Sequence, residues 1–157
     1  MQHYETFVFN SLNFYIVFIS SAWSCDKNDN NINTENNNDM TSGKIKIKVN
    51  SQTFTATLLD NNSTKAFKQM LPLIINMIEL NSNEKYYDLA GGLPTNSVNS
   101  GAIKNGDLML YGSKTLVLFY KTFSTSYSYT KLGRIDDVTG LASALGSGNV
   151  TVTFELE

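Results

Sequence analysis

Apolar and polar residues alternate along residues 44–58, KIKIKVNSQTFTATL. The apolar positions on one face are Ile45, Ile47, Val49, Phe54, Ala56 and Leu58. Because successive side chains of a strand point to opposite faces, this period of two predicts two strands with their apolar faces inward. The polar pair Asn50-Ser51 between them predicts a tight hairpin turn.

The period changes in DNNSTKAFKQM, residues 60–70. The apolar residues that recur at three- and four-residue spacing are Ala66, Phe67, Met70 and Leu71. This spacing predicts a short helix with one apolar stripe. Asn62 or Ser63 is expected to cap the helix, and Pro72 to end it.

The rest of the chain up to the C-terminus adds more short strands. Residues 71–80 fit either a strand or a helix, and Pro72 and the three isoleucines favour a strand. We also predict a strand over 84–89, a long loop over 91–106, a hairpin over 106–121 around Gly112-Ser113, a short helix over 138–145 capped by Asp137, and a last strand over 149–157. With one more strand from the stretch described next, the total is about eight strands and two short helices. So many strands are expected to close into a barrel or a sandwich, with the helices at its ends.

Aromatic residues stand on odd-numbered positions in FYKTFSTSYSYTKLGRI, residues 119–135. The run that leads into it, 116–120, is apolar without alternation, as in a central strand covered on both faces. We therefore place Phe119 in the core and Tyr120 on the opposite face. Residues 124–130, STSYSYT, are polar apart from two tyrosines, which is typical of a loop or a strand at a rim.

The first 24 residues differ from the rest of the chain in composition and in the order of their residue types. An apolar run over 14–19 is followed by small residues and then by Cys25, the one cysteine of the chain. This order is typical of a secretory leader, and the run is shorter than the roughly 20 apolar residues that span a bilayer. AWSC resembles the lipobox of bacterial lipoproteins, which implies that residues 1–24 are a signal peptide and that Cys25 is lipidated. The alternative is a buried free cysteine in an N-terminal strand.

Residues 25–43 comprise this cysteine and an Asn-rich segment with almost no apolar side chains. Such a segment cannot offset the entropy of ordering, so we predict a flexible tether whose 18 residues after Cys25 span about 23 Å. The folded domain is then 44–157. The expected location is the bacterial cell envelope, on the periplasmic side or the cell surface with the lipid in the membrane, or otherwise secretion.

Composition excludes several kinds of site. The net charge of −2 and the single arginine leave no basic face for nucleic acid. His3 is the one histidine and lies in the leader, so the mature chain cannot form a Ser-His-Asp or Cys-His site or a His/Cys zinc site. Glu84 and Asp88 are interpreted as ordinary surface charges. We expect no catalytic residue, metal or cofactor.

The order of motifs carries a resemblance. GDLMLYGSKTLVLFYK followed by LGRIDD resembles a bacterial cyclophilin-like family, and the opening hairpin, its helix and the terminal strand fit the same plan. The resemblance spans 44–157. It implies a mainly β protein, a closed barrel of about eight strands with two short capping helices and an open groove on one wall. The arginine-phenylalanine-glutamine cluster of true cyclophilins is absent, and Arg134, in G-R-I, does not match its arginine.

Aromatic residues in or after the central hairpin are the candidates for ligand binding, because a tyrosine ring stacks and its hydroxyl orients a ligand. The candidates are Tyr111, Tyr120, Phe123, Tyr127, Tyr129 and Arg134. Barrel packing for the aromatic residues, and an ion pair of Arg134 with Asp136 or Asp107, are the alternatives.

Three functions follow as hypotheses. The first is a tethered, non-catalytic binding domain for a small ligand or an extended peptide. The second is a divergent prolyl isomerase acting on envelope proteins. The third is an interaction module for another envelope protein.

Overall fold

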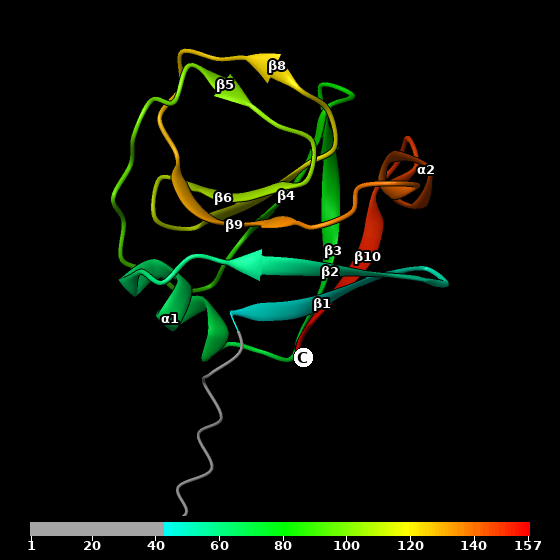
Figure 1. The fold of residues 1–157 in the computed structure, drawn as a ribbon, viewed down its shortest axis with the longest axis horizontal. Helices are drawn as coiled ribbons and strands as arrows, with labels where there is room; N and C mark the ends of the chain where they lie inside the picture. The colour runs from blue at the N-terminus through cyan, green and yellow to red at the C-terminus, as the bar shows by residue number, and fades with distance from the viewer. Residues whose placement is uncertain (1–42) are drawn as a thin grey trace, which may run out of the picture. The chain divides into compact units, whose positions relative to one another are not determined.

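The computed structural model describes residues 43–157, which form a closed antiparallel barrel of eight strands in the order β1-β10-β3-β4-β7-β6-β9-β2 (Figure 1). The barrel strands are β1 (Lys44–Val49), β2 (Gln52–Leu58), β3 (Leu73–Leu80), β4 (Glu84–Asp88), β6 (Asp107–Tyr111), β7 (Thr115–Phe119), β9 (Thr130–Ile135) and β10 (Val150–Leu156). The predicted mainly β class and closed barrel are confirmed. The leader, Cys25 and almost all of the predicted tether lie outside the described residues.

The opening hairpin forms as the alternation predicts. Val49 pairs with Gln52 across the two-residue turn, and Asn50 has a φ of 54°, the left-handed conformation that such turns require. All six apolar residues predicted to face inward are buried. The other edge of β1 pairs with β10, with Ile47 opposite Phe154, and this pairing closes the barrel.

Helix α1 (Asn62–Lys68) follows β2 and covers one end of the barrel. Its N-cap is Asn61, whose Oδ1 accepts a hydrogen bond from Thr64 N at 2.8 Å, so the prediction of Asn62 or Ser63 as the cap is wrong. Phe67 is fully buried and its ring meets Phe154 edge-on at 5.8 Å, which fixes the helix to the barrel interior.

Helix α2 (Leu141–Leu145) is shorter than predicted. Gly140, with a φ of 81°, is its N-cap, and the Asp137 carboxylate instead accepts from Thr139 N at 2.9 Å in the turn before the helix. The prediction of Asp137 as the cap is therefore wrong. Asn50 Nδ2 donates to Ala144 O at 2.9 Å, which holds α2 beside the β1–β2 turn, at the opposite end from α1 (Figure 1).

A separate two-stranded sheet, β5 (Ala102–Ile103) and β8 (Phe123–Ser124), lies outside the barrel wall (Figure 1). The sequence predicts β5 only as part of a long loop. Four buried residues form a second apolar cluster under this sheet: Ile103, Met109, Val117 and Phe119. Strand β7 is thus covered on both faces as predicted, with Phe119 facing this second cluster and Tyr120 the main core.

The stretch after β8 runs along the barrel without regular pairing until Thr130, apart from a single bridge between Tyr129 and Val98. The strand expected from this stretch is therefore β9. No helix within residues 43–157 has the length and apolar character needed to cross a membrane.

Candidate functional site

Strands β4, β7 and β6 are neighbours, and one face of these strands points away from the barrel interior. Tyr86 lies opposite Val117, Asp88 opposite Thr115, and Thr115 opposite Tyr111. Because residues two apart on a strand share a face, the outward positions form a continuous grid of side chains on the barrel wall. This grid includes Glu84 at the start of β4.

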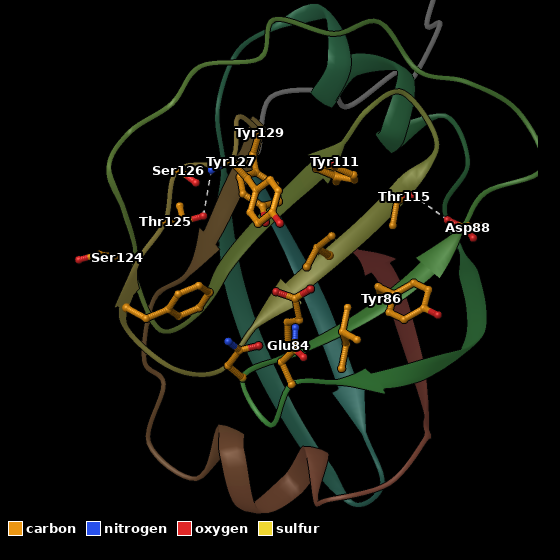
Figure 2. Close-up of a pocket in the computed structure, with 15 residues that line it drawn as sticks. Glu84, Tyr86, Asp88, Tyr111, Thr115, Ser124, Thr125, Ser126, Tyr127 and Tyr129 are labelled. Atoms are coloured by element: carbon orange, nitrogen blue, oxygen red, sulfur yellow. Dashed lines mark hydrogen bonds between the residues drawn. The ribbon is translucent and has the colours of Figure 1, made fainter.

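Residues 123–129 pass over the grid and enclose a pocket of about 560 Å³, which we call the outer pocket (Figure 2). The β3–β4 turn bounds it on one side. This volume lies within the roughly 300–1,000 Å³ of small-molecule sites. The pocket therefore has the size to hold a small ligand or a few residues of a peptide.

Three tyrosines form one wall of the outer pocket. The Tyr111 ring lies 6.0 Å from that of Tyr127 and 5.6 Å from that of Tyr129, centroid to centroid. Tyr129 also meets Phe119 edge-on at 5.4 Å, which connects this wall to the second apolar cluster. Tyr127 is 61% exposed and Tyr111 48% exposed, so two rings remain available at the rim.

Glu84 projects from β4 into the same pocket (Figure 2). Only 9% of the residue is exposed, yet within residues 43–157 its carboxylate accepts no hydrogen bond and joins no ion pair. Burial raises the pKa of Glu84, and the negative charge of Glu79 raises it further. The interpretation of Glu84 as a surface charge is wrong, because the side chain is enclosed by the pocket.

The pocket holds a second acceptor without a donor. Asn83, in the β3–β4 turn, lines the pocket, and its Oδ1 is buried with no hydrogen-bond partner among the described residues.

Burial raises the pKa of Tyr129 to about 12, with a contribution from the charge of Glu84. Tyr129 therefore keeps its phenolic proton at neutral pH.

Asp88 is the other carboxylate of the pocket, and it is already bonded. Its Oδ1 accepts from Thr115 Oγ1 at 2.6 Å at the exposed edge. Four strand positions separate it from Glu84, a distance of about 13 Å. Within residues 43–157 no group of three or more acidic, histidine or cysteine side chains is placed to bind a metal.

The opposite face of β4 carries a structural polar network. Lys85 is fully buried, and its Nζ donates to the Glu79 carboxylate, to Gly146 O at 2.8 Å and to Gly148 O at 2.6 Å. The Tyr120 hydroxyl donates to Glu79 at 2.8 Å, and burial together with this bond raises the pKa of Tyr120 to about 12. Tyr120 is thus directed into the barrel and away from the outer pocket.

Arg134 lies on β9, outside the residues that line the outer pocket. Its Nε donates to Asn105 O at 3.2 Å and stands 4.0 Å from Asp107 Oδ1. The nearer cation to Asp107 is Lys131, at 2.9 Å. The structure therefore brings Tyr111, Phe123, Tyr127 and Tyr129 into one pocket and leaves Tyr120 and Arg134 apart from it. Ligand binding by any of them stays a prediction.

Together these features define the class of molecule: a closed eight-stranded β-barrel with an aromatic pocket on its outer wall. Residues 47–155 match the model of the cyclophilin-like family, and the chain belongs to that family. The resemblance seen in the sequence is confirmed.

One solved structure is similar over most of its length. It is the solution structure of the hypothetical protein AF2241 from Archaeoglobus fulgidus, with a TM-score of 0.52 and 16% identity. The match covers 74% of this chain and 95% of that one. At this identity the likeness supports the fold alone. No curated protein matches the chain.

Proposed function

We propose that this protein is a surface-tethered, non-catalytic binding domain whose outer pocket holds a small ligand or an extended peptide. The observation that carries the proposal is the pocket of about 560 Å³ with an aromatic wall and an enclosed, unpartnered carboxylate. Sites that bind small molecules combine such an apolar lining with a few polar groups that fix orientation. The tether and the lipid on Cys25 are also part of this proposal, and the sequence alone supports them.

The side chains that residues 43–157 provide support the non-catalytic part of this proposal. Residues 43–157 contain no histidine or cysteine, so the usual nucleophile–base pairs cannot be assembled from them. Lys85 and the Tyr120 hydroxyl are committed to Glu79. Glu84 and Asp88 are too far apart along β4 to share a proton or a reacting atom.

A thermal-shift screen of the full chain against small molecules and extended peptides tests the proposal. Because a ligand that binds only the folded state at 100 times its Kd stabilises that state by about 2.7 kcal/mol, true ligands should raise the Tm by several degrees. Tyr127→Ser should weaken their binding at least tenfold. Ile74→Ser, which removes a 69% exposed side chain on β3 outside the pocket, is the matched control.

Two results would contradict the proposal. One is a set of ligands whose shift is equal in wild type and in Tyr127→Ser. The other is turnover: a protease-coupled assay on proline peptides should give no rate above the uncatalysed background, and a rate above it would favour the isomerase hypothesis.

A further inference from the structure

The outer pocket presents hydrogen-bond acceptors that lack donors. The Glu84 carboxylate and Asn83 Oδ1 come from consecutive residues, and both lie in the pocket lining. Within the described part of the chain Asn83 Oδ1 is buried without a hydrogen-bond partner, and the carboxylate of Glu84, a residue that is 9% exposed, makes no hydrogen bond or ion pair. A buried polar atom that is left unpaired, as Asn83 Oδ1 is, destabilises a fold by about 1–3 kcal/mol. Groups of this kind in a pocket are explained by a ligand that supplies the donors.

The surroundings of Glu84 favour a positive ligand. Among the described residues that line the pocket there is no lysine, arginine or histidine, and the two charged ones are both carboxylates, Glu84 and Asp88. Lys85, the nearest cation along the chain, points to the other face of β4 and is bonded there. Within residues 43–157 no cation is therefore paired with the Glu84 carboxylate.

The aromatic wall suits the same ligand. Tyrosine rings offer large apolar faces against which the carbon skeleton of an ammonium ion can pack. The Tyr111 ring lies 6.0 Å from the Tyr127 ring and 5.6 Å from the Tyr129 ring, centroid to centroid. Figure 2 shows the three rings across the pocket from Glu84. The arrangement places ring faces and a carboxylate around one space.

A metal ion fits the pocket less well. Calcium and magnesium need about six oxygen ligands, and Glu84 is the sole carboxylate at its end of the pocket because Asp88 is bonded to Thr115 about four strand positions away. An organic ammonium ion needs only a few acceptors and an apolar surface for its carbon skeleton.

We propose that the ligand of the outer pocket carries an ammonium group, which Glu84 and Asn83 Oδ1 bind while the tyrosines contact its apolar part. This inference rests on the proposed binding function and names the chemistry of what is bound. The ammonium group can belong to a free amine or to a lysine side chain of an extended peptide.

The test compares probes of nearly equal shape and different charge on the full chain. Ligand-observed NMR titrations would use phenethylamine as the cation, 2-phenylethanol as the neutral probe and phenylacetate as the anion. We expect phenethylamine to bind about tenfold more tightly than 2-phenylethanol, and phenylacetate to bind most weakly, since a charge-assisted hydrogen bond is the stronger kind.

Glu84→Gln should abolish the preference for the cation while leaving the affinity for 2-phenylethanol within about twofold. Because this change removes an unpaired buried charge, loss of the preference would not come from unfolding. Glu155→Gln, which neutralises a carboxylate on β10 outside the pocket, is the matched control and should keep the preference.

The outcomes separate this inference from the proposed function. Binding of 2-phenylethanol or phenylacetate that is at least as tight as that of phenethylamine and sensitive to Tyr127→Ser would overturn the ammonium assignment and leave the binding function standing. No pocket-dependent binding of any probe or peptide would overturn both. A blocked Ala-Lys-Ala peptide, compared with its form acetylated at the lysine amine, tells a peptide ligand from a free amine.

Discussion

Glu84 and Lys85 are adjacent in β4, and each side chain is at least nine-tenths buried, but their surroundings differ completely. Lys85 faces the barrel interior and has three acceptors around its Nζ. Glu84 faces the outer pocket and has none among the described residues. A buried charge that the fold needs is compensated by the fold, so an uncompensated one points to a role outside folding.

The first prediction concerns the stability of the ligand-free protein. The pKa of Glu84 is raised by burial above its value in the unfolded chain. The stability that its neutral form contributes is therefore fully present below the unfolded pKa and is lost as the pH rises through the folded pKa. Glu84→Gln stays neutral throughout, so we expect it to raise the free energy of unfolding by about 1 kcal/mol near pH 8.

Urea unfolding of wild type and variant at several pH values checks this. The difference between them should shrink as the pH falls into the acid range, where Glu84 is protonated in both states. Asp88→Asn should change stability by less than about 0.5 kcal/mol, because that carboxylate is exposed. Destabilisation by Glu84→Gln near pH 8 would mean that the carboxylate has a favourable partner in the protein.

At the scale of elements, the sequence predicts those strands whose apolar and polar residues form a local pattern. The alternation over 44–58 predicts both strands of the first hairpin and their buried faces, because period-two burial is a property of a single strand. The apolar run 116–120 predicts a strand covered on both faces for the same reason. The family motifs add the closure of the barrel.

Features that depend on distant contacts could not be predicted. Strands β5 and β8 have two residues each, and they pair only because β8 is brought over the second apolar cluster. Glu84 is distinguished by having no hydrogen-bond or ion-pair partner for its carboxylate within residues 43–157, and a local sequence pattern carries no information on such distant contacts. The sequence makes Arg134, the single arginine, a candidate for ligand binding, but its position on β9 takes it away from the tyrosines of the outer pocket.

The second prediction concerns how Lys85 joins three elements. Its Nζ connects β4 to Glu79 of β3 and to the Gly146 and Gly148 carbonyls between α2 and β10. Lys85→Met removes the cation and leaves the partly buried Glu79 carboxylate with the Tyr120 hydroxyl and without an ion pair. Because breaking a buried pair leaves an uncompensated charge, we expect a loss of about 3 kcal/mol in the free energy of unfolding.

Lys48→Met is the matched control for that measurement. Lys48 pairs with Glu155 at 2.7 Å, but both side chains are substantially exposed, and such pairs contribute about 0–1 kcal/mol. Urea unfolding should separate the two variants clearly. Equal losses would show that burial of Lys85 adds nothing beyond an ordinary surface pair.

At the scale of the whole molecule, the closed barrel determines where a ligand can bind. Its interior holds one apolar core and the buried polar network around Lys85, with α1 covering one end and α2 lying beside the β1–β2 turn at the other. Residues 123–129 pass over β4, β7 and β6 and so create a concavity on the outer wall, in which Asn83 Oδ1 is buried without a hydrogen-bond partner among the described residues. A site on the outer wall stays open to solvent, as the proposed binding of a ligand from solution requires.

The last prediction tests the proposed attachment of the chain to a membrane through a lipid. If the AWSC motif directs lipidation, the full chain expressed in a bacterium should fractionate with membranes, because a lipid on Cys25 adds about 0.8 kcal/mol of membrane affinity per buried CH₂ group. Cys25→Ser removes the thiol that takes the lipid and should shift most of the protein to the soluble or secreted fraction. Ser24→Ala keeps a small residue before the cysteine and should stay in the membrane fraction. If Cys25→Ser remains in the membrane fraction in the same amount as wild type, a lipid anchor is wrong and the chain is retained by other means.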